Sequence, residues 1–320
     1  FFFDKNAVAD IWASNLYFRE MMGYVPGKDL VMHTPIMDKD IYLLRKAHLR
    51  FGNYSPLTNQ LIFPSSLAGD DAFRIYVKYV KKYGVERIEG LPSVIFAFSQ
   101  FIEKSKVNVK VKTARIGGEM LYKFQRKHIE KFLGCEVFDA YGSGEGIIRS
   151  NECSEHNGMH LSPFGIYEVL NKGFNGTEEL LVTGLSNYAF PLIRYNIKDI
   201  VNLTEKRCRC GRNFTRVMSV EGRDNNFLVM PDGEKLHSGQ FAWLSVSVKG
   251  IKDIFFHQDK DHSLEIFVVK DKSRTKSEIV KEINKSMDRI LKRRIKYDII
   301  FKERIRRRSR KFRRVESEVN

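Results

Sequence analysis

Residues 109–145 read VKVKTARIGGEMLYKFQRKHIEKFLGCEVFDAYGSGE, and this stretch decides the fold class. It predicts a strand that ends in two glycines, then a helix, then a second strand that runs into another glycine-rich corner. Because strands and helices alternate, we expect a parallel α/β sheet whose strand-end loops form a site. Residues 117–119 and 141–145 then lie on neighbouring loops, and together they are expected to face a ligand.

The segments before this stretch fit the same alternation. We expect a first helix in AVADIWASNLYFREMMGYV, which Gly23 can stop. A second is expected in DDAFRIYVKYVKKYG, where it starts near Asp71 and ends at Gly84. A third is expected in VIFAFSQFIEKS. DLVMHTP reads as a buried strand, and VERIEGLPS reads as a short strand with a turn. The amino-terminal half is therefore predicted to be one α/β layer structure.

The pattern changes twice in the second half. From Gly158 onward, FGIYEVL, EELLVTGL and RYNIKDIVNL predict short strands and a β-rich subdomain. Beyond Glu221–Asn226, a hairpin formed by IKDIFFHQ and SLEIFVVK precedes an amphipathic helix with Thr275 or Lys276 near its cap. A last strand, YDIIFKE, completes a small α+β domain, so the chain is divided into residues 1–221 and 222–320.

Composition limits the class of protein. A hydrophobic content of 42% and a charged content of 29% are ordinary for a globular chain. No apolar run approaches the roughly 20 residues that a membrane span needs, and no signal-peptide pattern is visible. Four unevenly placed cysteines suit a reducing compartment, so we expect a cytoplasmic protein. The sequence leaves the oligomeric state open, a dimer included.

The net charge is +16, from 55 basic and 39 acidic residues, and much of the excess lies in ILKRRIKYDIIFKERIRRRSRKFRRVE. Such a tail could bind nucleic acid or an anionic membrane, or it could attract an anionic substrate as a solvated basic end. No aromatic-interleaved RNA motif or zinc-finger helix accompanies the charge, so nucleic acid is not the expected partner.

Five segments resemble the adenylate-forming ligases in order and separation, and the likeness runs over essentially the whole chain. They are GGE (117–119), DAYGSGEG (139–146), PLIRYNIKDI (191–200), EGRDNNFLVMPDGEKL (221–236) and RRSRKFRRV (307–315). The likeness is closest to the phenylacetate–coenzyme A ligases and the CapK-type proteins of capsular polysaccharide loci.

This resemblance implies ATP-dependent formation of an acyl-adenylate from a carboxylic acid, followed by transfer of the acyl group to a thiol such as coenzyme A. It also implies a large domain that is partial at its amino end, and a small carboxyl-terminal domain that rotates between the half-reactions. The acid is not readable, although EGLPSVIFAF is expected to line an acyl pocket.

The resemblance assigns roles to the two strand-end loops. Tyr141 would stack on the adenine, with the alternative that it is a core aromatic. Asp139 would lie near the exocyclic amine, and Glu145 would bind Mg²⁺, with the alternative of a solvated loop acid. The remaining nucleotide-binding residues of these loops are Gly117, Gly118, Glu119, Gly142 and Ser143. The family usually has Thr or Ser before the glutamate, where this chain has Gly144.

Asp199 matches the family's aspartate that accepts hydrogen bonds from both ribose hydroxyls, and its alternative is a turn aspartate. Arg194 is expected to be structural. Arg223 resembles the arginine beside the ribose, and the hinge position would be Asp224 or Asn225.

Lys311 aligns with the catalytic lysine that reaches the carboxylate and the α-phosphate during adenylation. Arg310 replaces the glycine that normally precedes it, so the loop is stiffer. The alternative is that Lys311 is one surface charge among many.

The cysteines suggest a second site. Some relatives in this branch carry a structural zinc, and the resemblance implies a closed tetrahedral site made of Cys153, His160, Cys208 and Cys210. His156 is the rival for the histidine position, and free thiols in the β-rich subdomain are the alternative. Cys135 begins a buried strand and is expected to be a core residue.

The Ser/Thr/Gly-rich phosphate loop of the family should precede the first helix, and the sequence contains no such stretch there. FPSSLAGDD has two serines but lies after the first helix and lacks the glycines. We therefore expect the chain alone to bind AMP or ATP weakly and to adenylate poorly. The rival function is a catalytically decayed homologue that acts as a basic nucleic-acid- or polysaccharide-associated binding module.

Overall fold

The computed structural model describes residues 2–34, 53–55, 59–63, 70–172, 178–223, 227–237, 241, 244, 248–291, 294–305 and 315–319. The chain divides into two compact units, Phe1–Val220 and Glu221–Asn320. This division lies one residue from the boundary expected from the sequence. That the units act as a large domain and a mobile small domain stays a prediction.

A six-stranded, mostly parallel sheet forms the first half of unit 1. Its order is β2(Asn53–Ser55), β3(Gln60–Ile62), β1(Val31–His33), β4(Arg87–Gly90), β5(Thr113–Gly117) and β6(Glu136–Ala140). Only β2 with β3 is antiparallel; the other neighbouring pairs are parallel. The predicted α/β class is confirmed, while β2 and β3 were not predicted.

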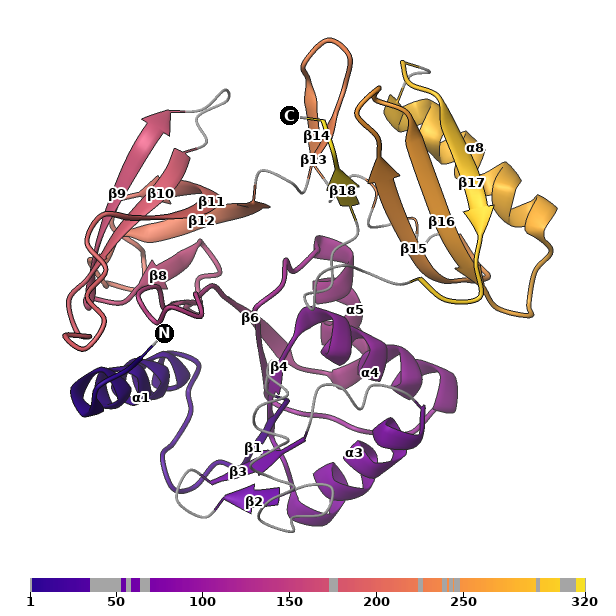
Figure 1. The fold of residues 1–320 in the computed structure, drawn as a ribbon. Helices are drawn as coiled ribbons and strands as arrows, with labels where there is room; N and C mark the ends of the chain where they lie inside the picture. Colours follow the sequence, from indigo (N-terminus) through magenta and orange to yellow (C-terminus); the bar gives the residue numbers. More distant parts are fainter. Residues whose placement is uncertain are drawn as a thin grey trace. The chain divides into compact units, whose positions relative to one another are not determined.

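The helices follow the expected boundaries. They are α1(Lys5–Met21), α3(Asp70–Tyr83), α4(Pro92–Ser105) and α5(Lys123–Leu133). Because α4 and α5 connect consecutive parallel strands that are added in one direction, right-handed crossovers put both on the same face of the sheet, as Figure 1 shows. Gly84 and Gly134 follow α3 and α5 with φ of 63° and 60°, a conformation that glycine adopts without steric cost.

Helix α1 is joined to the parallel sheet by a buried ion pair. The Arg19 guanidinium donates two hydrogen bonds of 2.7 Å to the Glu89 carboxylate on β4. Burial alone would raise the pKa of Glu89, but Arg19 holds it well below its usual value. Breaking one side of such a pair leaves an unpaired buried charge, so the position of α1 is strongly specified.

The β-rich part is a second six-stranded sheet, which starts at Ser150, earlier than expected. Its order is β7(Ser150–Glu152), β8(Met159–Leu161), β12(Arg216–Arg223), β11(Tyr195–Thr204), β10(Glu178–Gly184) and β9(Gly165–Lys172). Strands β9, β10 and β11 match the three predicted segments. A cluster of buried apolar residues that includes Ile148, Leu180 and Val201 forms its core.

Unit 2 has its own core. A hairpin of β13(Phe227–Val229) and β14(Lys235–His237) accompanies a sheet ordered β17(Tyr297–Phe301), β16(Leu264–Lys270), β15(Ile251–Gln258) and β18(Val315–Ser317). Helix α8(Lys276–Leu291) lies along this sheet (Figure 1). Thr275 caps α8 reciprocally, because its backbone N–H donates to Glu278 and its hydroxyl accepts from the Glu278 N–H. The hairpin β13–β14 and strand β18 were not predicted.

None of the helices in the described ranges is both long and apolar enough to cross a membrane.

Candidate functional site

The ends of β5 and β6 bring the two glycine-containing loops together, as predicted. Gly117, the last residue of β5, pairs with Ala140, the last residue of β6. A Cβ atom on Gly117 would lie 2.4 Å from the Ala140 carbonyl oxygen. The glycine is therefore required by the neighbouring strand, and a role for Gly117 in nucleotide binding stays a prediction. Gly118 follows with a φ of 86°, so the chain turns at once into the loop.

Glu119 has a structural contact that sequence reasoning missed. Its carboxylate accepts a hydrogen bond of 3.1 Å from the backbone N–H of Ser93, in the first turn of α4. The N-cap residue Leu91 offers no side-chain acceptor, so Glu119 satisfies an N–H that the helix leaves unpaired. A place for Glu119 beside an adenine stays a prediction.

Tyr141 and Asp199, which are 58 residues apart in sequence, are in direct contact. The Tyr141 hydroxyl, just after β6, donates a hydrogen bond of 2.8 Å to Oδ2 of Asp199 on β11. Both side chains are half-buried, and the Tyr141 ring packs against the apolar core of the second sheet. The predicted base-stacking residue and the predicted ribose-binding carboxylate thus lie at one place, where the two sheets meet.

Asp139 lies beside a group of charged residues at the end of β6. Burial, followed by the nearby Glu152 carboxylate, raises the pKa of Asp139 to about 7. Glu152 accepts two hydrogen bonds of 2.9 and 2.8 Å from Arg126 and one of 3.0 Å from the Asp139 backbone. A carboxyl that is half-protonated near neutral pH can both donate and accept hydrogen bonds.

The loop after Tyr141 is a tight turn with one unpaired hydroxyl. The Ser143 N–H donates to the Ile148 carbonyl at 3.2 Å, and the Gly146 N–H donates to the Ser143 carbonyl at 3.1 Å. The buried Ser143 hydroxyl has no partner within the described part of the chain. Glu145 is half-buried in this turn. Gly142 pairs with Arg149 in an isolated bridge that closes the turn.

Four residues singled out in the sequence are only partly described or not described. Arg223 ends strand β12, but its side chain lies outside the described residues. Asp224, Asn225 and Lys311 also lie outside them. Arg194, expected to be structural, is exposed and donates to Glu168 at 3.2 Å.

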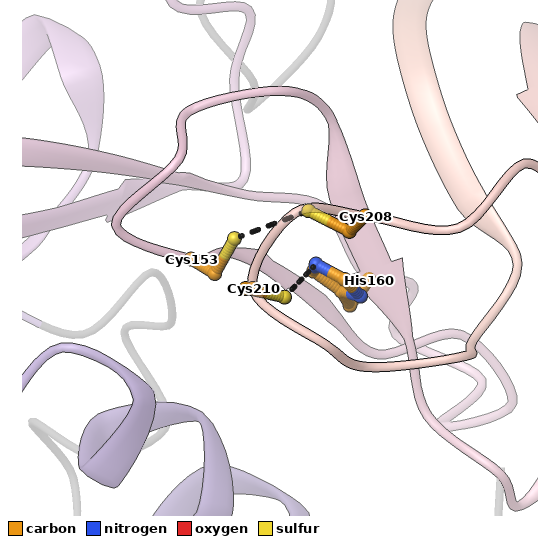
Figure 2. Close-up of side chains that lie close together, drawn as sticks. All are labelled: Cys153, His160, Cys208 and Cys210. Atoms are coloured by element: carbon orange, nitrogen blue, oxygen red, sulfur yellow. Dashed lines mark hydrogen bonds between the residues drawn. The ribbon is translucent and has the colours of Figure 1, made fainter.

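The four predicted metal ligands form one cluster (Figure 2), and their ligand atoms all lie within 4.8 Å of one another. The Sγ atoms of Cys153 and Cys208 are 3.8 Å apart, and Cys210 Sγ is 3.5 Å from His160 Nε2. Cys153 follows β7, His160 lies in β8, and the other two come from the turn before β12.

His156, the rival histidine, lies outside the cluster. Its two ring nitrogens contact Glu152 at 3.0 Å and Glu136 at 2.9 Å. Cys135 is buried, and burial raises the pKa of its thiol to about 12, as fits a core residue.

The surroundings of the cluster favour metal-binding forms of two ligands. Burial, followed by the charges of Arg216 and Arg212, lowers the pKa of His160 to about 4, which keeps its imidazole neutral. Burial would raise the pKa of Cys210, but hydrogen bonds from Arg212 outweigh it and lower that pKa. In contrast, burial raises the pKa of Cys153 to about 12. A cation among the thiols would offset that penalty.

No protein-family model matches the sequence. Among curated proteins, CapK of Staphylococcus aureus is 27% identical over 216 residues, which cover 66% of this chain and 47% of CapK. A phenylacetate–coenzyme A ligase of Thermus thermophilus is 28% identical over 169 residues, which cover 48% of this chain and 38% of the ligase. The chain thus spans about half the length of the curated relatives that it matches.

Solved structures show the same fold. A 2-hydroxyisobutyryl-CoA ligase in its postadenylation state superimposes with a TM-score of 0.71 at 18% identity, covering 97% of this chain and 70% of that one. A benzoate CoA ligase from Burkholderia xenovorans LB400 gives a TM-score of 0.59 at 15% identity, covering 93% and 63%. The chain has the fold of the adenylate-forming ligases. In sequence it is similar to CapK and to the phenylacetate–coenzyme A ligases.

Proposed function

We propose that this chain carries the nucleotide site and the carboxyl-terminal domain of an acyl-adenylate-forming ligase. The ligase would join a carboxylic acid to the α-phosphate of ATP, expel pyrophosphate and pass the acyl group to a thiol, with coenzyme A as the acceptor. The observation that carries this proposal is the contact between Tyr141 and Asp199 beside the loops that follow β5 and β6. The names of the sequence relatives support it.

Each site residue has a chemical task in this proposal. The Tyr141 ring offers a face for the adenine, and Asp199 offers carboxylate oxygens for the two ribose hydroxyls. Asp139 sits at the end of β6, where its carboxyl can accept from the exocyclic amine. The 2-hydroxyisobutyryl-CoA ligase has been solved in complex with R3-HIB-AMP and with 2-HIB-AMP and CoA, and this agrees with the proposed ligands.

Glu145 is the proposed Mg²⁺ ligand. Its half-buried carboxylate has no hydrogen-bond or ion-pair partner in the described part of the chain, so an oxygen ligand is available of the type that Mg²⁺ prefers. When bound, the ion would offset the charge of the ATP phosphates. Lys311 is proposed to contribute the positive charge near the reacting carboxylate.

We also propose that Cys153, His160, Cys208 and Cys210 hold a structural Zn²⁺. At a Zn–S distance of about 2.3 Å, two thiolates at tetrahedral corners lie roughly 3.8 Å apart, and a thiolate and an imidazole nitrogen lie roughly 3.6 Å apart. The observed distances of 3.8 and 3.5 Å fit these values. With four protein ligands the site is closed, and its role is structural. Reduced thiols also fit a cytoplasmic location.

The ligase proposal is tested by two measurements on the same preparation. Equilibrium dialysis with AMP should show weak binding that is lost in Asp199→Asn. Pyrophosphate release should depend on one member of a panel of aryl and acyl carboxylic acids. If no acid triggers release and the chain instead binds nucleic acid in a salt-sensitive manner, the basic binding module is the correct function.

A further inference from the structure

A histidine and several carboxylates gather at one end of the sheet in unit 2. His257 lies near the end of β15 and pairs directly with Glu265 on the neighbouring strand β16. Asp259 follows two residues later, and Glu318 follows the end of β18. Paired residues of neighbouring strands, and residues two apart in one strand, point to the same face. The strand register therefore places His257 and Glu265 side by side on one face, and Asp259 and Glu318 directly follow the ends of β15 and β18.

Their ligand atoms are close enough to share one ion. One ligand atom each from His257, Asp259 and Glu265 lies within 4.8 Å of the other two. His257 Nε2 is 3.4 Å from Asp259 Oδ1 and 3.8 Å from Glu318 Oε1. Nitrogen and oxygen ligands at tetrahedral corners of an ion such as Zn²⁺ lie about 3.3 Å apart. The histidine and Asp259 are thus already spaced as ligands.

The backbone around these residues is held by a buried amide. Gln258, between His257 and Asp259, is fully buried, and its side-chain oxygen accepts from the Val229 N–H at 2.8 Å and the Ser317 hydroxyl at 2.9 Å. Its side-chain nitrogen donates to the Val229 carbonyl at 2.9 Å. Its backbone carbonyl accepts from the Glu318 N–H at 2.8 Å. These bonds fix the ends of β15 and β18 relative to each other, which is the support that a ligand site needs.

A group of carboxylates is unusual in this chain, because the net charge of the chain is +16. Asp259 and Glu265 bring two carboxylates to one imidazole, and a divalent cation would offset the repulsion between them. The exposed fractions of the side chains, 17% for His257 and 47% for Asp259, leave access from solvent.

We propose that His257, Asp259 and Glu265, with Glu318 as a fourth ligand, form a second metal site that binds a divalent transition-metal ion. Imidazole and carboxylate ligands without thiolate suit Zn²⁺, Co²⁺ or Mn²⁺, which separates this site chemically from the cysteine cluster of unit 1. Its partial exposure leaves room for water in the coordination sphere. The site is independent of the proposed ligase reaction.

The test is a zinc count on the untagged full chain by equilibrium dialysis against buffered Zn²⁺. His257→Ala and Glu265→Gln should each bind one equivalent fewer than the wild type, or bind that equivalent at least about tenfold more weakly. His262→Asn is the matched control, since His262 lies in the adjoining turn but outside the group. His262→Asn should bind as many equivalents of zinc as the wild type. A thermal melting curve checks that each variant is folded.

Cobalt separates the two sites. Co²⁺ bound by Cys153, Cys208 and Cys210 should show a thiolate-to-metal charge-transfer absorption, which Cys208→Ser weakens. Co²⁺ at His257 should bind without that absorption and should persist in Cys208→Ser. If wild type, His257→Ala and Glu265→Gln bind equal amounts of zinc and cobalt, the group is a solvated ion-pair cluster and the proposal is wrong.

Discussion

Tyr141 and Asp199 are hydrogen-bonded to each other. The Tyr141 hydroxyl donates to only one carboxylate oxygen of Asp199, and a carboxylate has about four acceptor positions. In the proposed site this bond is kept while the ribose hydroxyls donate to the same carboxylate. In the proposed site, the hydroxyl of Tyr141 orients the carboxylate, and its ring provides the stacking face.

Replacing Tyr141 by Phe should separate these two tasks. Without the hydroxyl the Asp199 carboxylate is no longer held in one orientation, and ordering it on binding costs about 1 kcal/mol, so AMP should bind roughly fivefold more weakly. Tyr141→Ala should cost more, because base stacking is lost as well. Dissociation constants from equilibrium dialysis check this, with Tyr167→Phe as control, since that hydroxyl contacts Ser162 instead. Equal AMP affinity in all three variants would contradict the assignment.

Asp139 should make stability depend on pH. Its pKa is raised from 3.8 to about 7, so the folded chain keeps a proton that the unfolded chain releases. The resulting stabilisation is complete below about pH 4 and is lost as the pH rises through 7. The side chain of Asp139→Asn is neutral at every pH. The free energy of unfolding of this variant, measured relative to wild type, should therefore increase by on the order of 2 kcal/mol from pH 5 to pH 8. Urea unfolding at both values measures this. An identical pH dependence in the two proteins would show that the raised pKa is wrong.

At the scale of elements, helix α1 packs directly against the cysteine cluster. Phe18 and Met21 of α1 pack against Cys153 and Cys208, and the Tyr17 hydroxyl accepts from the Arg212 guanidinium at 3.0 Å. A metal ion in the cluster would therefore also fix the surface on which α1 rests.

Removing the metal should loosen α1. Chelation, or Cys208→Ser, is expected to reduce the stability of unit 1 by on the order of 3 kcal/mol and to speed amide hydrogen exchange in α1. Exchange in α8 of unit 2 serves as the internal control and should not change. Metal analysis gives a direct check, and less than about half an equivalent of zinc in chain purified without chelator would count against the site.

Elements with a long pattern were predictable, and short ones were not. The apolar spacing and the terminal glycines gave α3 and α5 within a few residues. Strands of three residues, such as β2, β13 and β18, are too short to show a period. β18 is also paired with β15, far back in the sequence, so nothing local indicates it.

At the scale of the whole chain, the sequence predicted which loops lie at the candidate site. It did not predict which residues those loops contact. Strand order alone predicts that the loops after β5 and β6 are neighbours. The bond between Tyr141 and Asp199 requires the fold of the second sheet, and the contact of Glu119 with α4 requires the packing of a helix against a loop. Conversely, the choice between His156 and His160 was open in the sequence, and the fold brings only His160 to the thiols.

The tight fit of Gly117 against the Ala140 carbonyl changes how variants at this position should be read. An added methyl group would push apart two adjacent strands, and Tyr141, one residue beyond Ala140, would move with its strand. A defect in nucleotide binding caused by such a variant would report the spacing of the sheet. It would therefore be no measure of how closely a purine approaches that glycine.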